Sequence, residues 1–513
     1  MKRGYTVHSK STSDRTHDKR SPAKAKQAGR LPNPRKRDHP DIGVPLCVDL
    51  DGTLIRTDLL LESLFGLLRR NFGYLFLIPF WLLRGKARLK DEIAQRVNLD
   101  VNLLPYNKSF LEYLQAEHRS GRHLCLATAS HRKFATKVAA HIGIFSNVLA
   151  TTADENLSRE RKLARLLHEF GERGFDYAGN SRADLKLVPH ARAVILVNPE
   201  LGVTWAAART GTVIRTFIDR KASLKTYAKA LRLHQWVKNL LVFVPLVADH
   251  RIGDFVLLIQ AGIAFVVFGV CASSVYMLND LLDLAADRKH SRKRKRPFAA
   301  GTLSLKLGAL LAPLLLLLAF AVSLLFLPLL FSAALGVYYV VTLAYSFWLK
   351  GKMMVDIIVL AGLYTLRIIA GGAAVAIMPS FWLLALSMFL FLSLAMVKRY
   401  SELIEQSNAE KSRVAGRGYV ADDHAQLSSL GAASGYAAVM VLALYINSPD
   451  GALQYRYPMA IWFLCPLLLY WISRVWVMAG RGKMHDDPIV FAIRDRVSRL
   501  VALVGVAIMW VAA

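Results

Sequence analysis

The chain has 513 residues, which is enough for more than one domain, and 54% of them are apolar. The apolar runs crowd into the second half, so the composition excludes a wholly soluble protein and indicates a membrane part joined to a soluble part. The formal net charge of +29 lies largely in loops beside the apolar runs, which favours membrane topology and anionic lipid headgroups over nucleic acid as its explanation.

Residues 1–41 form a basic segment with little to bury. Residues 1–40 contain 12 Lys and Arg against 3 Asp, together with many Ser and Pro. Such a composition cannot stabilise a packed core, so we expect a disordered, solvated tail, with binding to a lipid surface as an alternative.

Residues 42–219 are expected to form an α/β domain with a parallel sheet. A short apolar run in VPLCVDLDGTLIRTD predicts a buried strand that ends in a loop carrying Asp49 and Asp51. Ligands of such folds bind at the carboxyl edge of the sheet. One Asp can act as a nucleophile that forms a phospho-aspartate, and the second as a general acid or base. The D-x-D pattern alone is weak, so the interpretation depends on three later segments.

These segments are HLCLATAS, NLSRERK and YAGNSRADL. Together with D-x-D they resemble the motifs of the haloacid dehalogenase (HAD) phosphohydrolases. The resemblance implies that the Thr128 hydroxyl holds a phosphate oxygen and that Lys162 offsets the charge of the aspartates and the phosphate. The ligands that it implies for Mg²⁺ are Asp49, Asp51, Asn180 and Asp184. Asn180 stands where the family has an Asp, which removes one negative charge and lowers the expected Mg²⁺ affinity.

Residues 56–120 show helical periodicity and include the apolar patch FGYLFLIPFWLL at 72–83. This patch is too short to cross a bilayer and contains Pro79, so we expect a helical cap over the HAD site. The alternative is a segment that rests on the membrane surface.

Residues 220–513 are expected to form an all-α membrane domain. It opens with a basic amphipathic segment whose Trp and Lys suit a membrane interface. The apolar runs that follow predict nine transmembrane helices, at residues 237–249, 255–278, 307–329, 331–349, 354–378, 380–397, 428–447, 457–479 and 496–513. The loops on one side carry nearly all the Lys and Arg. By the positive-inside rule these loops and the N-terminal domain are cytoplasmic, which predicts a multi-pass protein of a bacterial-type inner membrane.

The segment NDLLDLAADRKHSRKRKRP begins at Asn279, at the end of the second apolar run. Asp280, Asp283 and Asp287 are spaced i, i+3 and i+7, so on a helix they share one face. Three such carboxylates repel one another unless a cation such as Mg²⁺ neutralises them. The basic residues that follow provide positive charge that can bind an anionic substrate. The alternative is an acidic helix end followed by a solvated basic loop.

This segment resembles the first motif, N-D-x-x-D-x-x-x-D, of the UbiA superfamily of intramembrane prenyltransferases. Asn279 and the three aspartates stand at its positions, and the resemblance implies a prenyl phosphate bound through Mg²⁺. Members usually carry a second D-x-x-x-D motif, where this chain has only Asp356, a further candidate metal ligand. Asp356 and Arg367 are eleven residues apart and share a helical face within the membrane. They indicate either a functional site in a wet cavity or a structural contact that holds helices together.

The single-Asp form, together with RLHQWVKN and LAMVKRYSEL, resembles one subgroup, the decaprenyl-phosphate phosphoribosyltransferases. The resemblance covers residues 228–513. It implies transfer of ribose 5-phosphate from phosphoribosyl diphosphate (PRPP) to a polyprenyl phosphate, with Mg²⁺ stabilising the departing diphosphate. The residues expected to contact substrate in this half are Lys238, Asn239, Asn279, Lys289, Arg294, Arg296, Tyr345, Lys352, Arg367, Lys398 and Arg399.

We therefore expect a Mg²⁺-dependent membrane transferase that acts on polyprenyl phosphate, with a fused HAD domain that dephosphorylates the product. One alternative moves a prenyl group from a prenyl diphosphate to an aromatic or other small acceptor. Another is a transporter or a membrane scaffold with a regulatory soluble domain.

Overall fold

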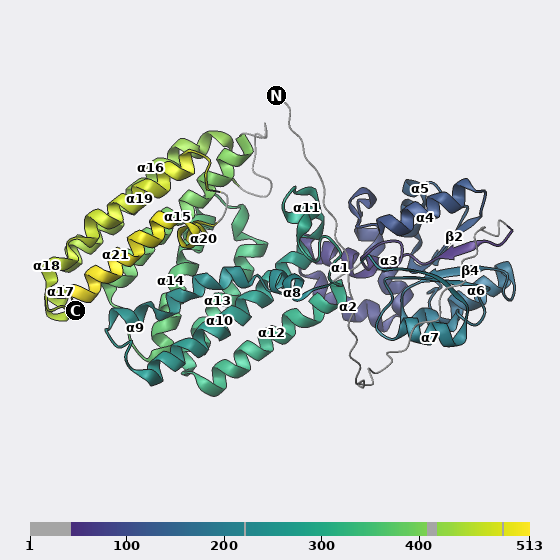
Figure 1. The fold of residues 1–513 in the computed structure, drawn as a ribbon, viewed down its shortest axis with the longest axis horizontal. Coiled ribbons are helices and arrows are strands. Elements are labelled where there is room, and N and C mark those ends of the chain that lie inside the picture. The colour runs from purple at the N-terminus through teal and green to yellow at the C-terminus, as the bar shows by residue number, and fades with distance from the viewer. Residues whose placement is uncertain (1–42, 220–221, 408–417, 485–486, 513) are drawn as a thin grey trace, which may run out of the picture.

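The computed structural model describes residues 43–219, 222–407, 418–484 and 487–512, and it has two parts that lie end to end along its longest axis (Figure 1). The first is an α/β domain and the second is a bundle of long helices. The basic tail expected for residues 1–41 lies outside the described residues.

A six-stranded parallel sheet forms the centre of the α/β domain, with strand order β3-β2-β1-β4-β5-β6. The strands are β1 (Leu46–Val48), β2 (Leu124–His131), β3 (Asn147–Thr151), β4 (Asp176–Gly179), β5 (Val194–Val197) and β6 (Val213–Phe217). The strand order reverses direction at β1, which places a crevice at the carboxyl ends of β1 and β4. The parallel sheet expected from the sequence is confirmed.

Both faces of this sheet are buried, because successive strand residues point to opposite sides. Leu46 and Val48 contribute to one core cluster and Cys47 to the other. The helices that cover the faces are α4 (Lys108–Arg119) and α5 (Arg132–Ile142) on one side, and α6 (Glu160–Phe170) and α7 (Val203–Thr210) on the other (Figure 1).

The segment between β1 and β2 forms the helical cap. Its helices are α1 (Leu59–Arg70), α2 (Tyr74–Leu83) and α3 (Lys86–Arg96), followed by the short turn η1 (Val101–Leu103). The cap expected over residues 56–120 is therefore shorter, because α4 buries Phe110 and Leu114 in the core of the sheet.

Long apolar helices make up the second part. They are α10 (Phe255–Leu282), α12 (Leu305–Phe326), α13 (Leu329–Phe347), α14 (Val355–Val375), α15 (Phe381–Ser407), α16 (His424–Ile446) and α18–α19 (Pro458–Ile461 and Leu464–Gly480). In the described part of the chain, these seven are long and apolar enough to cross a membrane. A multi-pass membrane protein is thus confirmed, whereas the count of nine is not.

The two remaining apolar runs form shorter helices. The first is the continuous stretch η3–α9 (Leu233–Phe243 and Val244–Ala248), and the second is α21 (Arg496–Ala512) with 17 residues. The other short elements are α8 (Leu224–Ala230), α11 (Leu284–Lys289), η4 (Lys293–Lys295), η5 (Leu349–Gly351), η6 (Ala421–Asp423), α17 (Pro449–Gln454), α20 (Pro488–Arg494) and, in the α/β domain, η2 (Arg182–Lys186).

Helix α1 joins the two parts. Phe65 and Leu68 on α1 pack in one cluster with Met277 and other residues at the end of α10. The carboxylate of Glu62 accepts a bidentate ion pair from Arg288 on α11, with Nη2 3.0 Å from Oε2, and both side chains are buried. The α/β domain is therefore anchored to the membrane part by an apolar contact and a buried ion pair.

We expect Arg288→Met to weaken this junction by about 3–5 kcal/mol, because Glu62 would keep its charge in a buried site without a counterion. Thermal unfolding of the detergent-solubilised protein, together with limited proteolysis between its two parts, measures the effect. The double variant Glu62→Leu, Arg288→Met removes both charges and should recover most of the lost stability. Equal destabilisation of the single and double variants would show that the ion pair does not hold the junction.

Candidate active sites

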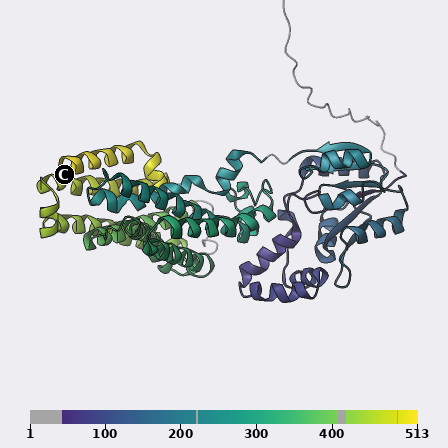
Figure 2. The ribbon, with the colours of Figure 1, turned by 90° about the horizontal axis from the view of Figure 1, so that it is seen from below.

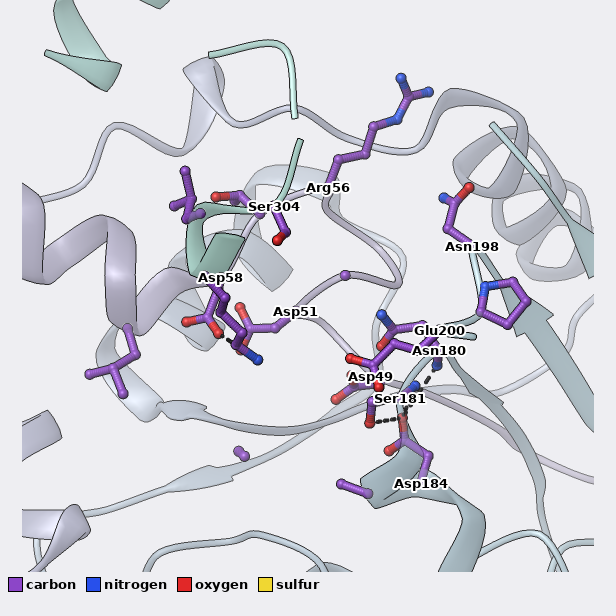
Figure 3. Close-up of a pocket in the computed structure, with 18 of the residues that line it drawn as sticks. Asp49, Asp51, Arg56, Asp58, Asn180, Ser181, Asp184, Asn198, Glu200 and Ser304 are labelled. Carbon is purple, nitrogen blue, oxygen red and sulfur yellow. Dashed lines mark hydrogen bonds and ion pairs between the residues drawn. The ribbon is translucent and has the colours of Figure 1, made fainter. Parts of the chain in front are cut away.

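Polar side chains gather at the carboxyl edge of the sheet, where β1 and β4 end. Asp49 follows β1 directly and Asn180 follows β4, and Figure 3 shows them close to Ser181 and Asp184. Because the two strands are neighbours, the crevice between them brings together segments about 130 residues apart in the chain.

Lys162, from α6, connects the acidic groups of this site. Its Nζ lies 2.8 Å from Asp49 Oδ1 and 3.7 Å from Asp184 Oδ1, and it donates to the Tyr177 hydroxyl at 2.6 Å. Burial alone would lower the pKa of Lys162, but the charges of Asp49 and Asp184 outweigh it and the net shift is upward. The sequence-based expectation that Lys162 offsets the aspartates agrees with this placement.

The two aspartates of D-x-D have raised pKa values. Burial raises the pKa of Asp49 to about 6, against the opposing charge of Lys162. Burial, followed by the nearby charge of Asp58, raises the pKa of Asp51 to about 7. Asp51 accepts hydrogen bonds from the Leu59 N–H at 2.8 Å and from the Ser130 hydroxyl at 2.5 Å. Asp51 is thus poised to hold or release a proton near neutral pH.

Asn180 is fitted closely against the turn after β1. Its Oδ1 accepts from the Thr53 hydroxyl at 3.3 Å. Gly52 has φ +79°, and a Cβ at that position would lie 2.3 Å from Asn180 Nδ2. The turn therefore requires glycine both for its left-handed conformation and for the space that Asn180 takes.

Thr128 does not reach the crevice in the described structure. It is fully buried in β2, where its Oγ1 accepts from the Ser130 N–H at 3.0 Å. The neighbouring Ser130 contacts Asp51 instead. Sequence analysis missed Ser130, although a second hydroxyl residue two positions after Thr128 was the available signal.

The crevice opens into a pocket of about 1190 Å³ that both parts of the protein line. Asp49, Asp51 and Asp184 lie on the α/β side, and residues 302–307, at the start of α12, lie on the membrane side. In Figure 3, Ser304 from this membrane-side segment is well apart from Asp184. The pocket is therefore an interdomain site.

The aspartate motif of the membrane part lies at the end of α10 that faces the α/β domain. Arg296 Nη1 contacts Asp280 at 3.1 Å and both carboxylate oxygens of Asp287 at 2.7 and 3.0 Å. Arg232 also pairs with Asp280. Asp280 and Asp287 thus converge on one cationic nitrogen.

Asp283 belongs to a different set of contacts. It pairs with Arg69 of the cap at 3.2 Å and with Lys350 at 3.5 Å. The three aspartates were expected on one helix; in the structure Asp283 stands between the end of α10 at Leu282 and the start of α11 at Leu284. A residue of the α/β domain therefore contacts the membrane motif directly.

In the part of the chain that the structure describes, no three acidic, His or Cys side chains are gathered as a metal site. The donors nevertheless fit a hard cation that Asp280 and Asp287 would hold, since three of their carboxylate oxygens already converge on one cationic nitrogen, Arg296 Nη1. At the α/β site, Asp49 and Asp184 offer oxygens in the same way around the Lys162 ammonium.

Asp487 organises a second buried cluster. Its carboxylate accepts from Lys238 at 2.6 Å, from Lys398 at 3.1 Å and from the Tyr364 hydroxyl at 3.0 Å. Burial opposes ionisation, but the charges of Lys238 and Lys398 hold the pKa of Asp487 well below its usual range. Sequence analysis missed Asp487, although Asp-Pro is a typical signal for the start of a helix, here α20.

Arg367 lies beside this cluster and not beside Asp356. It donates to Asn239 Oδ1 at 3.2 Å, to the Tyr338 hydroxyl at 3.1 Å and to the Leu363 carbonyl at 2.5 Å. Asn239 is buried, and its Nδ2 has no hydrogen-bond partner in the described part of the chain. A buried amide donor beside a guanidinium can serve as a binding site for an anion.

Asp356 has other partners than expected. It accepts from Arg399 Nε at 2.6 Å and from the Tyr419 hydroxyl at 2.7 Å, and Arg399 also donates to Tyr345 at 2.7 Å. Asp356 and Arg367 thus belong to one helix, α14, but have separate partners. The position of Asp356 instead couples α14 to α15.

The remaining residues that were expected to contact substrate lie closer to the protein surface. Lys289, Arg294 and Lys352 are exposed, and Asn279 is half-buried. The structure thus brings some of the expected residues into polar clusters and leaves Lys289, Arg294 and Lys352 at the surface. Those in clusters are Arg296, Lys238, Lys398, Asn239, Arg367, Arg399 and Tyr345.

Two family models match the chain. That of the UbiA prenyltransferase family matches residues 240–493, and that of the haloacid dehalogenase-like hydrolases matches residues 46–188. The uncharacterized protein y4nM of Sinorhizobium fredii is 35% identical over 461 residues, which cover 89% of each chain.

Two further relatives match about half of this chain. Nodulation protein NoeC of Azorhizobium caulinodans is 37% identical and is covered to 93% of its length by 56% of this chain. The decaprenyl-phosphate phosphoribosyltransferase of Mycobacterium tuberculosis is 34% identical and is covered to 91% by 54% of this chain. Nearly the whole of each relative is thus represented here.

The raised pKa values of Asp49 and Asp51 predict that metal binding competes with protons. Below about pH 6 both carboxyls are largely protonated, so Mg²⁺ affinity at this site should fall as pH is lowered from 8 to 5.5, with proton release on binding near pH 6.5. Calorimetric titration of EDTA-stripped protein in two buffers measures both quantities.

The variant Asp49→Asn, Asp51→Asn supplies the control, since subtracting its signal isolates this site from any binding to the membrane aspartates. A pH-independent difference between the two proteins would contradict the raised pKa values.

Proposed function

The chain belongs to the UbiA prenyltransferase family and carries a haloacid dehalogenase-like hydrolase domain, and from this premise we propose that it transfers phosphoribosyl from PRPP to a polyprenyl phosphate. The relative named decaprenyl-phosphate phosphoribosyltransferase supports the choice of donor and acceptor. The observation that carries the proposal is the orphaned Asn239 donor beside Arg367, which indicates an anion site buried in a membrane protein.

The acceptor phosphate fits the Asp487 cluster. Lys238 and Lys398 can turn from Asp487 to a phosphate, and Asn239 Nδ2 supplies a further donor. Apolar surface of the neighbouring helices then accommodates the polyprenyl chain. An acceptor oxygen held there attacks C1 of the ribose as the bond from C1 to the diphosphate breaks.

The departing diphosphate fits the aspartate motif. Mg²⁺ bound to Asp280 and Asp287 would act as a Lewis acid that stabilises the leaving group. With a cation held by Asp280 and Asp287, the Arg296 guanidinium, which now contacts these carboxylates, would be available to hold a diphosphate oxygen. Lys350 and Arg69 keep Asp283 neutralised nearby.

The HAD domain would then remove the 5-phosphate from the lipid-linked product. Asp49 attacks phosphorus, and Asp51 protonates the ribose oxygen that leaves, so that a phospho-aspartate remains and is hydrolysed by water. The pKa of about 7 for Asp51 suits a general acid that later acts as a base. The ammonium group of Lys162 offsets the negative charges of Asp49 and of the phosphate.

The proposal also covers the number of membrane crossings and the side of the membrane on which the HAD domain lies. The η3–α9 stretch and α21 complete nine crossings, and the HAD domain lies in the cytoplasm with the basic loops of an inner-membrane protein. Both active sites then face the compartment that contains PRPP.

Double-labelled PRPP tests the scheme with purified protein in nanodiscs that contain polyprenyl phosphate. With ¹⁴C in the ribose and ³²P at the 5-phosphate, the wild type should give a lipid with ¹⁴C only, together with free ³²P phosphate. Asp49→Asn should give a lipid with both labels. Absence of ¹⁴C from the lipid would refute the transfer and favour prenyl transfer or transport, whereas identical products from both proteins would refute only the coupled dephosphorylation.

Asp287→Asn should lower ribose incorporation into lipid by about 100-fold or more. The substitution removes one of the two carboxylates that would hold Mg²⁺ against the departing diphosphate. Asp249→Asn is the control, since Asp249 is an exposed acid outside every cluster described above. Initial rates at saturating PRPP decide the outcome, and equal rates for the two variants would exclude the aspartate motif from catalysis.

A further inference from the structure

Helix α2 of the cap is apolar on both sides. Its inner side buries Trp81, which packs with Tyr74 and Ile78 against other cap residues. Its outer side exposes Phe76 and Phe80, at 73% and 64% of their full accessible area. Leucines at positions 75, 77, 82 and 83 are exposed as well. A water-facing helix would carry polar residues on this side, so the exposed face indicates a binding surface.

The position of α2 shows which surface it meets. Phe72, just before the helix, has its ring centroid 5.1 Å from that of Phe347, the last residue of α13. Tyr74 and Ile78 also pack in the cluster formed by the ends of α10 and α12. Figure 2 shows the purple cap helices beside the junction of the two parts. Helix α2 is therefore packed against the ends of three membrane spans.

Length and charge also suit a lipid surface. The ten residues of α2 span about 15 Å, half of a bilayer core, so the helix can lie on a membrane but cannot cross it. Residues 63–90 contain six Lys and Arg and no Asp or Glu. Of these, Arg70, Arg84 and Lys86 are exposed next to the helix, where anionic headgroups would meet them.

The same face leads to the interdomain pocket. Leu82 of α2 and Leu60 of α1 line the pocket that holds Asp49, and Leu305 and Leu307, at the start of α12, line it from the membrane side. The pocket thus has an acidic and cationic end at the sheet and an apolar wall that begins where a span enters the membrane. This combination fits an amphiphile.

We infer that α2 lies in the leaflet that faces the α/β domain, and that the Asp49 pocket takes phosphomonoesters carried on membrane lipids. The lipid tail stays between α2 and the first turn of α12 while the phosphorylated head reaches Asp49. The substrate class rests on the hydrolase activity proposed above, whereas the placement of α2 does not. A product made in the membrane part reaches the hydrolase without leaving the bilayer.

Spin labels test the placement of α2. The native cysteines are buried, so a single exposed cysteine can be introduced for labelling. The label of Phe80→Cys, in nanodiscs of phosphatidylcholine and phosphatidylglycerol, should collide with O₂ far more often than with a water-soluble nickel chelate. Gln115→Cys, on the exposed side of α4, is the matched control and should show the reverse. Equal nickel accessibility at the two sites would overturn the inference and favour a protein partner for this face.

Phe76→Asp, Phe80→Asp tests the substrate class. This variant should hydrolyse the lipid-linked phosphoribosyl product at least about tenfold more slowly than the wild type, with unchanged hydrolysis of ribose 5-phosphate and an unchanged melting temperature. Phe76→Leu, Phe80→Leu should behave like the wild type. Equal loss on both substrates would overturn lipid delivery by α2. A wild type inactive on both substrates would refute the proposed hydrolase, and the spin-label result would still decide where α2 lies.

Discussion

The buried ion pair between Glu62 and Arg288 is the contact on which the relative position of the two candidate sites depends. It joins cap helix α1 to α11, within one residue of Asp287 in the aspartate motif. A buried charge needs its partner, so the two residues keep α1 in one position against the membrane part. From the same helix, Arg69 reaches Asp283. The α/β domain therefore contacts the aspartate motif of the membrane part directly.

Charge compensation also explains the inner polar clusters. Each buried carboxylate is matched by cations from a different segment: Asp487 by Lys238 and Lys398, and Asp356 by Arg399. In a medium of low dielectric such pairs are stable only when their partners are close. The clusters therefore hold the helices together, and in the proposed mechanism Lys238 and Lys398 exchange Asp487 for a phosphate.

Much of this organisation could be predicted from motifs. D-x-D after a short apolar run indicated a parallel sheet with an acidic carboxyl edge, and the structure has both. The partners of the charged residues could not be predicted, since they come from loops and helices far apart in the chain. Asp487 and Asn239 are 248 positions apart, yet both belong to the surroundings of Lys238 and Arg367. The spacing of Asp356 and Arg367 places both on α14, but it does not predict their partners, Arg399 and Asn239, which come from other elements.

By itself, the sequence determined the two-part architecture, the buried strand that leads into Asp49 and Asp51, and the position of the aspartate motif at the end of an apolar helix. These features depend on local hydrophobic pattern and on residues that are close in the chain. Only the tertiary structure decided that Asp283 turns to the cap while Asp280 and Asp287 share Arg296, and that the Asp49 pocket is completed by the start of α12. These outcomes depend on how α1 packs against α10 and α11, and such long-range packing is not encoded in any single segment.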